Sequence, residues 1–66
     1  MDHQEYAQAK AKFLNLVASV PLQLRNEIIA VINNQAIDWF IATEEIKRDT
    51  EQAERIIKQL KNIGLL

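Results

Sequence analysis

A chain of 66 residues has room for one domain, and at that size a single hydrophobic core is marginal without further support. It contains no cysteine, which excludes disulfides and thiolate metal sites and leaves oligomerisation as the leading way to add stability. With 48% hydrophobic residues, 26% charged residues and a net charge of −1, the composition is globular, and the lack of a basic excess argues against nucleic-acid binding.

The apolar runs are short, and the longest covers only residues 28–32. A membrane span needs roughly 20 predominantly apolar residues in succession. The N-terminus is polar and acidic, unlike a signal peptide. We therefore expect a soluble, cytoplasmic protein with no membrane partner.

The first helix is predicted from about residue 3 to residue 19. Asp2, with Glu5 three positions later, matches a capping box, and good helix formers follow as far as Ala18. The apolar arc of this helix, which includes Phe13, exceeds half of the circumference. That is wider than contact with one neighbour requires. We expect the helix to contact at least two others.

A tight turn is predicted around Pro21. Proline disfavours helical backbone in the preceding residue, Val20, but suits the first turn of a following helix. Ser19 is the expected cap of that second helix. So short a connection favours an antiparallel helical hairpin.

The second helix is predicted from about residue 21 to residue 62, with Gly64 as its C-terminal stop. No glycine or proline lies between Pro21 and Gly64, and apolar residues recur there at alternating steps of three and four. This a/d pattern lasts for about five heptads and is typical of a helix whose seam faces another helix. The helix would be about 60 Å long, against about 27 Å for the first one.

The difference in length predicts self-association, because the first helix can cover only half of the second. Beyond Ala42 the apolar stripe narrows, and acids precede bases at i,i+4, as in Glu44 and Arg48. We predict an all-α fold with a single helical domain over residues 1–66. In it a helical hairpin forms a homodimer, or a tetramer, built as a four-helix bundle with a coiled-coil arm. The predicted oligomer interface is the seam: Ile29, Ile32, Ala36, Trp39, Ile46, Ala53, Ile57 and Leu60.

Two sites are compatible with a break in the second helix. Asn33 and Asn34 are poor helix formers, and the segment that begins at Asp49 resembles a new N-cap. A break at Asp49 would give a third helix of about 12 residues that folds back into a three-helix bundle. The heptad register passes through both sites without a skip, which favours the continuous helix.

No pattern in the sequence indicates catalysis. His3 is the only histidine, it has no cysteine or second histidine to share a metal, and no nucleophile with a base and an orienting group is recognisable. We therefore expect no enzyme activity, no cofactor and no metal. Trp39 and Phe40 are expected in the core, because they lie where the apolar stripe requires bulk.

A second apolar strip, formed by Ala30, Ile37 and Ile41, lies on the helix side opposite the seam. In a simple dimer this strip is exposed and is a candidate surface for another protein. In a four-helix arrangement the first helix of the second copy would cover it instead.

Three functions compete on this basis. The favoured one is a small non-enzymatic helical protein that self-associates and acts as a protein–protein interaction or regulatory module, of the kind that small bacterial or phage chains often supply. The second is a nucleic-acid-binding helical-hairpin dimer, which is an analogy from fold alone and which the acidity of the chain argues against. The third is a purely structural oligomerisation module.

Overall fold

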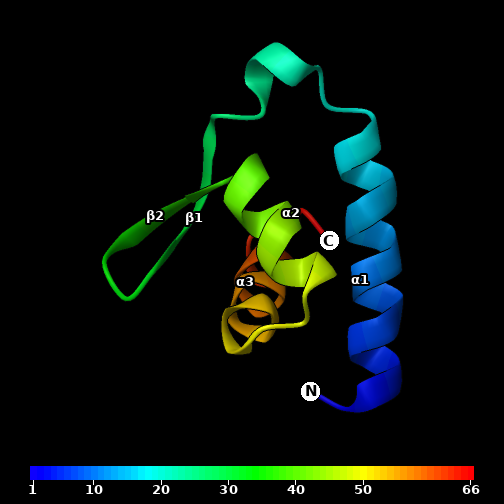
Figure 1. Cartoon of the computed structure of the whole chain (residues 1–66). Helices are drawn as coiled ribbons and strands as arrows, with labels where there is room; N and C mark the ends of the chain where they lie inside the picture. Colours follow the sequence, from blue (N-terminus) through cyan, green and yellow to red (C-terminus); the bar gives the residue numbers. More distant parts are fainter.

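The chain beyond Pro21 does not form one long helix. The computed structural model describes all 66 residues and contains three α-helices, one 3-10 turn and a two-stranded sheet (Figure 1). The predicted all-α helical hairpin, four-helix bundle and coiled coil are therefore wrong. In chain order the elements are α1 (His3–Ala18), η1 (Leu22–Leu24), β1 (Ile28–Ile32), β2 (Gln35–Asp38), α2 (Trp39–Lys47) and α3 (Glu51–Asn62).

Helix α1 begins at the predicted cap. The Oδ1 atom of Asp2 accepts a hydrogen bond from the Glu5 N–H at 2.7 Å, which satisfies a donor that has no partner within the helix. The helix ends at Ala18, and Ser19 is its C-cap rather than the cap of a second helix. As the wide apolar arc predicted, α1 lies against two other helices, α2 and α3.

No α-helix begins at Pro21, which instead precedes the short turn η1. The next residue after η1, Arg25, reaches back to the end of α1. Its guanidinium donates to the carbonyl oxygens of Val17 and Val20, at 3.1 Å in each case. The Arg25 side chain thus adds a hydrogen bond to the last turn of α1, at Val17, and a second to the connection, at Val20, which holds the connection against the end of the helix.

The segment predicted as the start of the long helix is an antiparallel β-hairpin. β1 is rich in β-branched side chains, which favour a pleated strand. Asn33 and Asn34, between the strands, have positive φ angles of 52° and 66°. Two successive residues with positive φ make the two-residue turn whose twist matches that of a hairpin, and asparagine tolerates this conformation. The two asparagines therefore end β1 and reverse the chain.

The predicted helix is interrupted a second time at Asp49, where φ is 53°. α2 begins at Trp39, with Asp38 as its cap, and ends before this residue. α3 then has 12 residues, so the break at Asp49 that the heptad register disfavoured is present. The predicted stop at Gly64 is confirmed by its φ angle of 84°, a conformation that suits glycine.

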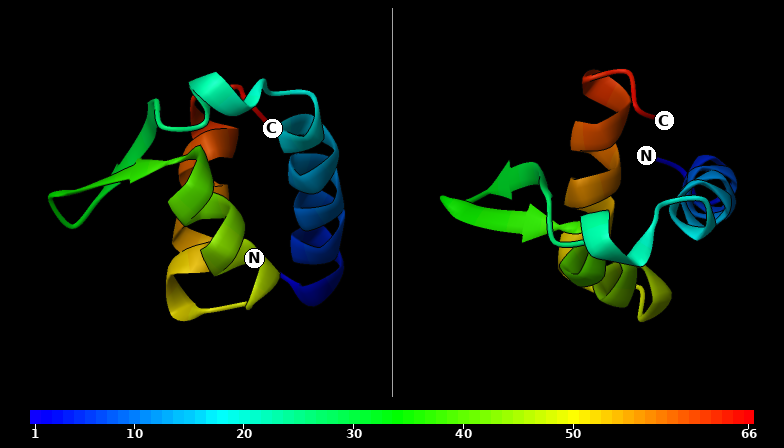
Figure 2. Two further views of the ribbon diagram at one scale, coloured as in Figure 1. Left: turned by 45° about the horizontal axis from the view of Figure 1, so that its top comes forward. Right: turned by 90° about the horizontal axis from the view of Figure 1, so that it is seen from above.

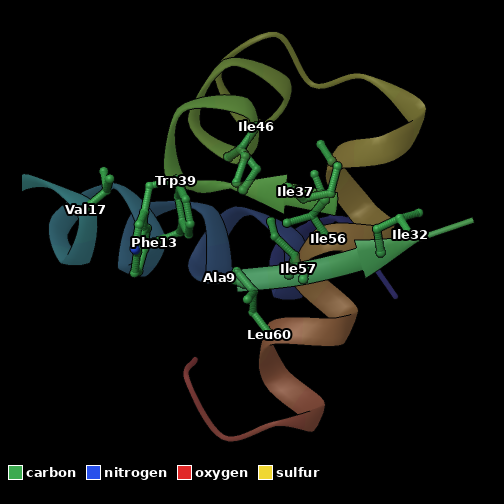
Figure 3. Packing of buried hydrophobic residues seen from close by; sticks show 13 residues of the cluster. Ala9, Phe13, Val17, Ile32, Ile37, Trp39, Ile46, Ile56, Ile57 and Leu60 are labelled. Carbon is green, nitrogen blue, oxygen red and sulfur yellow. The ribbon is translucent and has the colours of Figure 1, made fainter. Parts of the chain in front are cut away.

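A single hydrophobic cluster joins the three helices to the hairpin (Figure 3). Phe13 of α1 stacks on Trp39 of α2 with ring centroids 5.9 Å apart. All residues of this core are hydrophobic, so it contains no charged side chain. None of the helices combines the length and the hydrophobicity that a bilayer span requires. The cluster comprises Ala9, Phe13, Val17, Ala30, Ile32, Ile37, Trp39, Ala42, Ile46, Ala53, Ile56, Ile57 and Leu60.

The hairpin extends away from the helices, with its turn at the far end (Figure 2). Only one of its faces contributes to the core, through Ala30, Ile32 and Ile37. β1 lies against α3, and β2 leads directly into α2. The position of the hairpin leaves its other face and its β2 edge on the outside of the molecule.

Candidate functional site

The outer face of the hairpin is apolar although it is exposed. Val31 of β1 lies opposite Ala36 of β2, and both point away from the core. Val31 is 54% exposed and Ile28, at the start of β1, is 57% exposed. A face of a two-stranded sheet that contacts only water normally carries polar side chains. We call Ile28, Val31 and Ala36 the hairpin surface.

A β-bulge brings Ile28 onto this face. Ala30 is paired with Ile37 and Ile28 with Asp38, so Ile29 is an extra residue that has no partner on β2. Without the bulge, the alternation of side chains would direct Ile28 to the same side as the buried Ala30. With the bulge, Ile28 joins Val31 on the outside, which adds a large apolar side chain to the hairpin surface.

The two edges of the hairpin differ. The outer edge of β1 is occupied by Gln59 of α3, whose side-chain amide donates to the carbonyl oxygen of Val31 at 3.0 Å and accepts from the Val31 N–H at 2.7 Å. In an antiparallel pair of this kind, the opposing residue also turns its peptide groups outward. Ala36 lies opposite Val31, so its N–H and C=O point to the free edge of β2.

Further apolar side chains are exposed beside the base of the hairpin. Phe40 is 47% exposed and Leu24 is 46% exposed. The Phe40 N–H donates to the carbonyl oxygen of Arg25 at 3.3 Å, which holds the segment after η1 against the start of α2. Phe40 is thus not in the core where the apolar stripe predicted it, whereas Trp39 is.

A separate polar cluster, formed by Tyr6, Lys10 and Asp49, joins α1 to the turn after α2. Asp49 is at its centre. Its carboxylate accepts hydrogen bonds from the Tyr6 hydroxyl at 2.9 Å and from the Lys10 ammonium at 2.8 Å. Desolvation, together with the hydrogen bond to Asp49, raises the pKa of Tyr6 to about 12. The hydrogen bonds from Lys10 and Tyr6 lower the pKa of Asp49.

Both shifts move these groups further from neutral pH. A general acid or base is most effective with a pKa near the working pH, so neither Tyr6 nor Asp49 is prepared for proton transfer at pH 7. The cluster instead ties α1 to the turn between α2 and α3. Shallow hollows between α1 and α3 are likewise lined mainly by charged and polar side chains, including Lys61 and Glu5, which pair at 3.0 Å.

No family model, no curated protein and no solved structure matches this chain. The candidate site is therefore chosen from the geometry and chemistry of the chain itself. On those grounds the hairpin surface, with the open edge of β2, is the strongest candidate.

The structure distributes the residues of the predicted seam differently from a coiled coil. Ile29 is partly buried, and Ala36 is exposed on β2. The others belong to the core of the single chain, where they cannot form a helical seam with a second copy. These buried seam residues are Ile32, Trp39, Ile46, Ala53, Ile57 and Leu60.

The predicted partner strip is also divided. Ala30 and Ile37 are buried against the helices, and only Ile41, at 37% exposure, is accessible. Sequence reasoning missed Val31 and Gln59 entirely. A signal for the hairpin existed in the pair Asn33–Asn34, which stands between two short apolar segments, but Gln59 is distant in sequence and carried no such signal.

Proposed function

We propose that this chain is a small non-catalytic protein-interaction module that binds an extended segment of a protein partner through the hairpin surface. The observation that carries the proposal is the apolar outer face of a hairpin that extends away from the helices (Figure 2). Exposed apolar patches on small proteins commonly mark interaction sites. An extended segment is the partner chemistry that an unpaired strand edge accepts, because main-chain hydrogen bonds recognise any extended backbone.

The energetics support a contact of modest affinity. Complete burial of an isoleucine or valine side chain contributes about 1.5–3 kcal/mol relative to exposure, and the hairpin surface offers Ile28 and Val31 for this. Hydrogen bonds to the Ala36 peptide groups would fix the orientation of the bound segment and contribute little to the free energy of binding. Loss of rotational and translational freedom opposes these gains, so we expect a reversible interaction.

The test is a selection of binding peptides from a random display library, followed by mapping of the bound peptide by NMR. Val31→Lys places a charge in the centre of the hairpin surface. Ala7→Lys is the matched control, since it adds the same charge at an exposed position of α1. Circular dichroism of both variants checks that the fold is retained.

We expect selected peptides to shift the amide resonances of residues 28–40 and to bind Val31→Lys at least about tenfold more weakly, while Ala7→Lys binds like the wild-type protein. The proposal fails if no peptide is selected, or if the selected peptides bind wild type and Val31→Lys equally well.

A further inference from the structure

We propose that the open edge of β2 pairs with β2 of a second copy of this chain, which forms a continuous four-stranded antiparallel sheet. This inference rests on the proposed function and names the partner that pairs with the open edge of β2. It differs from the predicted coiled coil, since strands and not helices make the contact.

The two edges of the hairpin are not equivalent. Gln59 binds both peptide groups of Val31 and so closes the edge of β1 against any additional strand. Nothing equivalent closes the edge of β2, where Ala36 points its N–H and C=O outward. A new strand can therefore add on one side only, and the assembly stops at two copies instead of growing into a fibre.

The edge of β2 also lacks the residues that normally protect an exposed strand. Proteins that remain monomeric usually blunt an exposed strand with lysine, proline or an inward-pointing charge. β2 has the sequence Gln35-Ala36-Ile37-Asp38, and its only charge lies at its last residue. Asp38 is also engaged as the cap of α2, where its Oδ1 atom accepts from the Ile41 N–H at 2.8 Å. The centre of the edge is unprotected.

The strand β2 is also self-complementary. When two antiparallel strands are related by a two-fold axis at Ala36, each Ala36 donates to and accepts from the other. Gln35 then faces Ile37 of the second copy, and Asn34 faces its Asp38. The two Asp38 residues lie at opposite ends of the contact, about 14 Å apart along the strands, beyond the Debye length at physiological salt.

The direction in which the hairpin extends suits this arrangement. The hairpin turn points away from the helices and β2 enters α2 at the other end, so antiparallel pairing places the two helical bodies at opposite ends of the sheet (Figures 1 and 2). Ala36 is small, which allows close approach at the axis. On the outer face, Val31 and Ala36 of one copy continue into Ala36 and Val31 of the other, which doubles the apolar row.

The experiment measures mass by sedimentation equilibrium over a range of protein concentrations, together with hydrogen exchange of individual amides. For the wild-type chain we expect the mass to rise from 7.6 kDa toward twice that value, with protection of the Ala36 amide increasing in parallel. The Val31 amide, already bonded to Gln59, should show no such concentration dependence.

Two variants and one control complete the design. Ala36→Pro removes the outward N–H without removing a bond of the hairpin itself, and Ala36→Lys adds a charge that opposes its copy across the axis. Gln23→Lys adds the same charge at an exposed residue of η1. We expect Ala36→Lys to raise the dimer dissociation constant at least about tenfold and Gln23→Lys to leave it unchanged.

A wild-type chain that stays at 7.6 kDa at millimolar concentration would overturn this inference, as would a dimer that persists in Ala36→Lys or shows no added protection at Ala36. If Ala36→Pro does not fold, the Ala36→Lys variant and the hydrogen-exchange data still show whether the two copies pair through β2. Selected peptides that map to the hairpin of a strictly monomeric chain would leave the proposed function standing while this inference fails. Failure of the peptide selection removes the proposed function, whatever mass the sedimentation experiment gives.

Discussion

Gln59 acts as a substitute strand for Val31. Its side-chain amide makes the two hydrogen bonds, at 2.7 and 3.0 Å, that a neighbouring backbone would otherwise make. One residue of α3 thereby anchors β1 to the helices and removes one of the two edges of the sheet. An isolated two-stranded hairpin is at best marginally stable in water, so this link also helps the hairpin to persist.

The first prediction concerns this link. Gln59→Ala should lower the free energy of unfolding by about 1–2 kcal/mol, because two hydrogen bonds are lost and the edge of β1 must be hydrated. Urea unfolding followed by circular dichroism measures the change. Gln8→Ala is the control, an exposed glutamine in the middle of α1 with the same change in helix propensity. Equal unfolding midpoints for the two variants would contradict the anchoring role of Gln59.

The turn of the hairpin gives a second prediction. Asn34 has a φ angle of 66°, a conformation that is unfavourable for most residues other than glycine, asparagine and aspartate. Asn34→Ala should therefore destabilise the protein by about 1 kcal/mol, whereas Asn34→Gly should preserve or increase its stability. The order of the thermal midpoints, with glycine at or above wild type and alanine below it, checks the turn. Alanine and glycine variants of equal stability would show that this turn is not formed.

Trp39 distinguishes the observed core from the predicted seam. Because its ring stacks on Phe13 of the same chain, Trp39→Ala should reduce the free energy of unfolding by about 3–5 kcal/mol at every protein concentration. Urea unfolding of variant and wild type at two widely spaced concentrations measures this difference. If the difference between them grew with concentration, Trp39 would have to lie in a contact between subunits.

The raised pKa of Tyr6 leads us to expect that the stability of the folded chain falls at alkaline pH. Its pKa is raised to about 12 in the folded chain, above the ordinary value of 10.0, so the folded state favours the protonated form. The corresponding stability is fully present below pH 10 and is lost as the pH rises toward 12. Tyr6→Phe lacks this contribution, so its disadvantage relative to wild type should shrink over that interval. A constant difference between the two proteins from pH 8 to pH 12 would refute the assignment.

The lowered pKa of Asp49 leads us to expect that the stability of the folded chain falls at acidic pH. Its pKa is lowered in the folded chain, so its contribution is present above the ordinary value of 3.8 and is lost as the pH falls below it. Asp49→Asn keeps a residue type that tolerates the φ angle of 53° and removes the titrating group. The stability of wild type relative to this variant should therefore fall on acidification. Parallel stability curves between pH 6 and pH 2 would contradict the role of the Asp49 carboxylate.

Two features that depend on neighbouring residues were predicted correctly, whereas the predicted role of Ser19 as the cap of a helix after Pro21 was wrong. The cap at Asp2 and the stop at Gly64 follow from backbone groups within a few positions of each residue, and both are present. The broad apolar arc of α1 correctly indicated contact with more than one helix. The alternating steps of three and four beyond Pro21 gave the wrong fold, because the spacing was continuous across two turns, one in which Asn33 and Asn34 take positive φ and one in which Asp49 does.

The amino-acid sequence by itself determined where α1 begins and how the chain stops after α3. Only the tertiary structure decided that residues 28–38 form a hairpin, because strand preferences amount to about 1 kcal/mol and are settled by what the strand packs against. Packing against α3 buries Ile37 and exposes Val31, and it brings Gln59 to an edge 28 positions away in sequence. The candidate interaction surface is what that packing leaves uncovered.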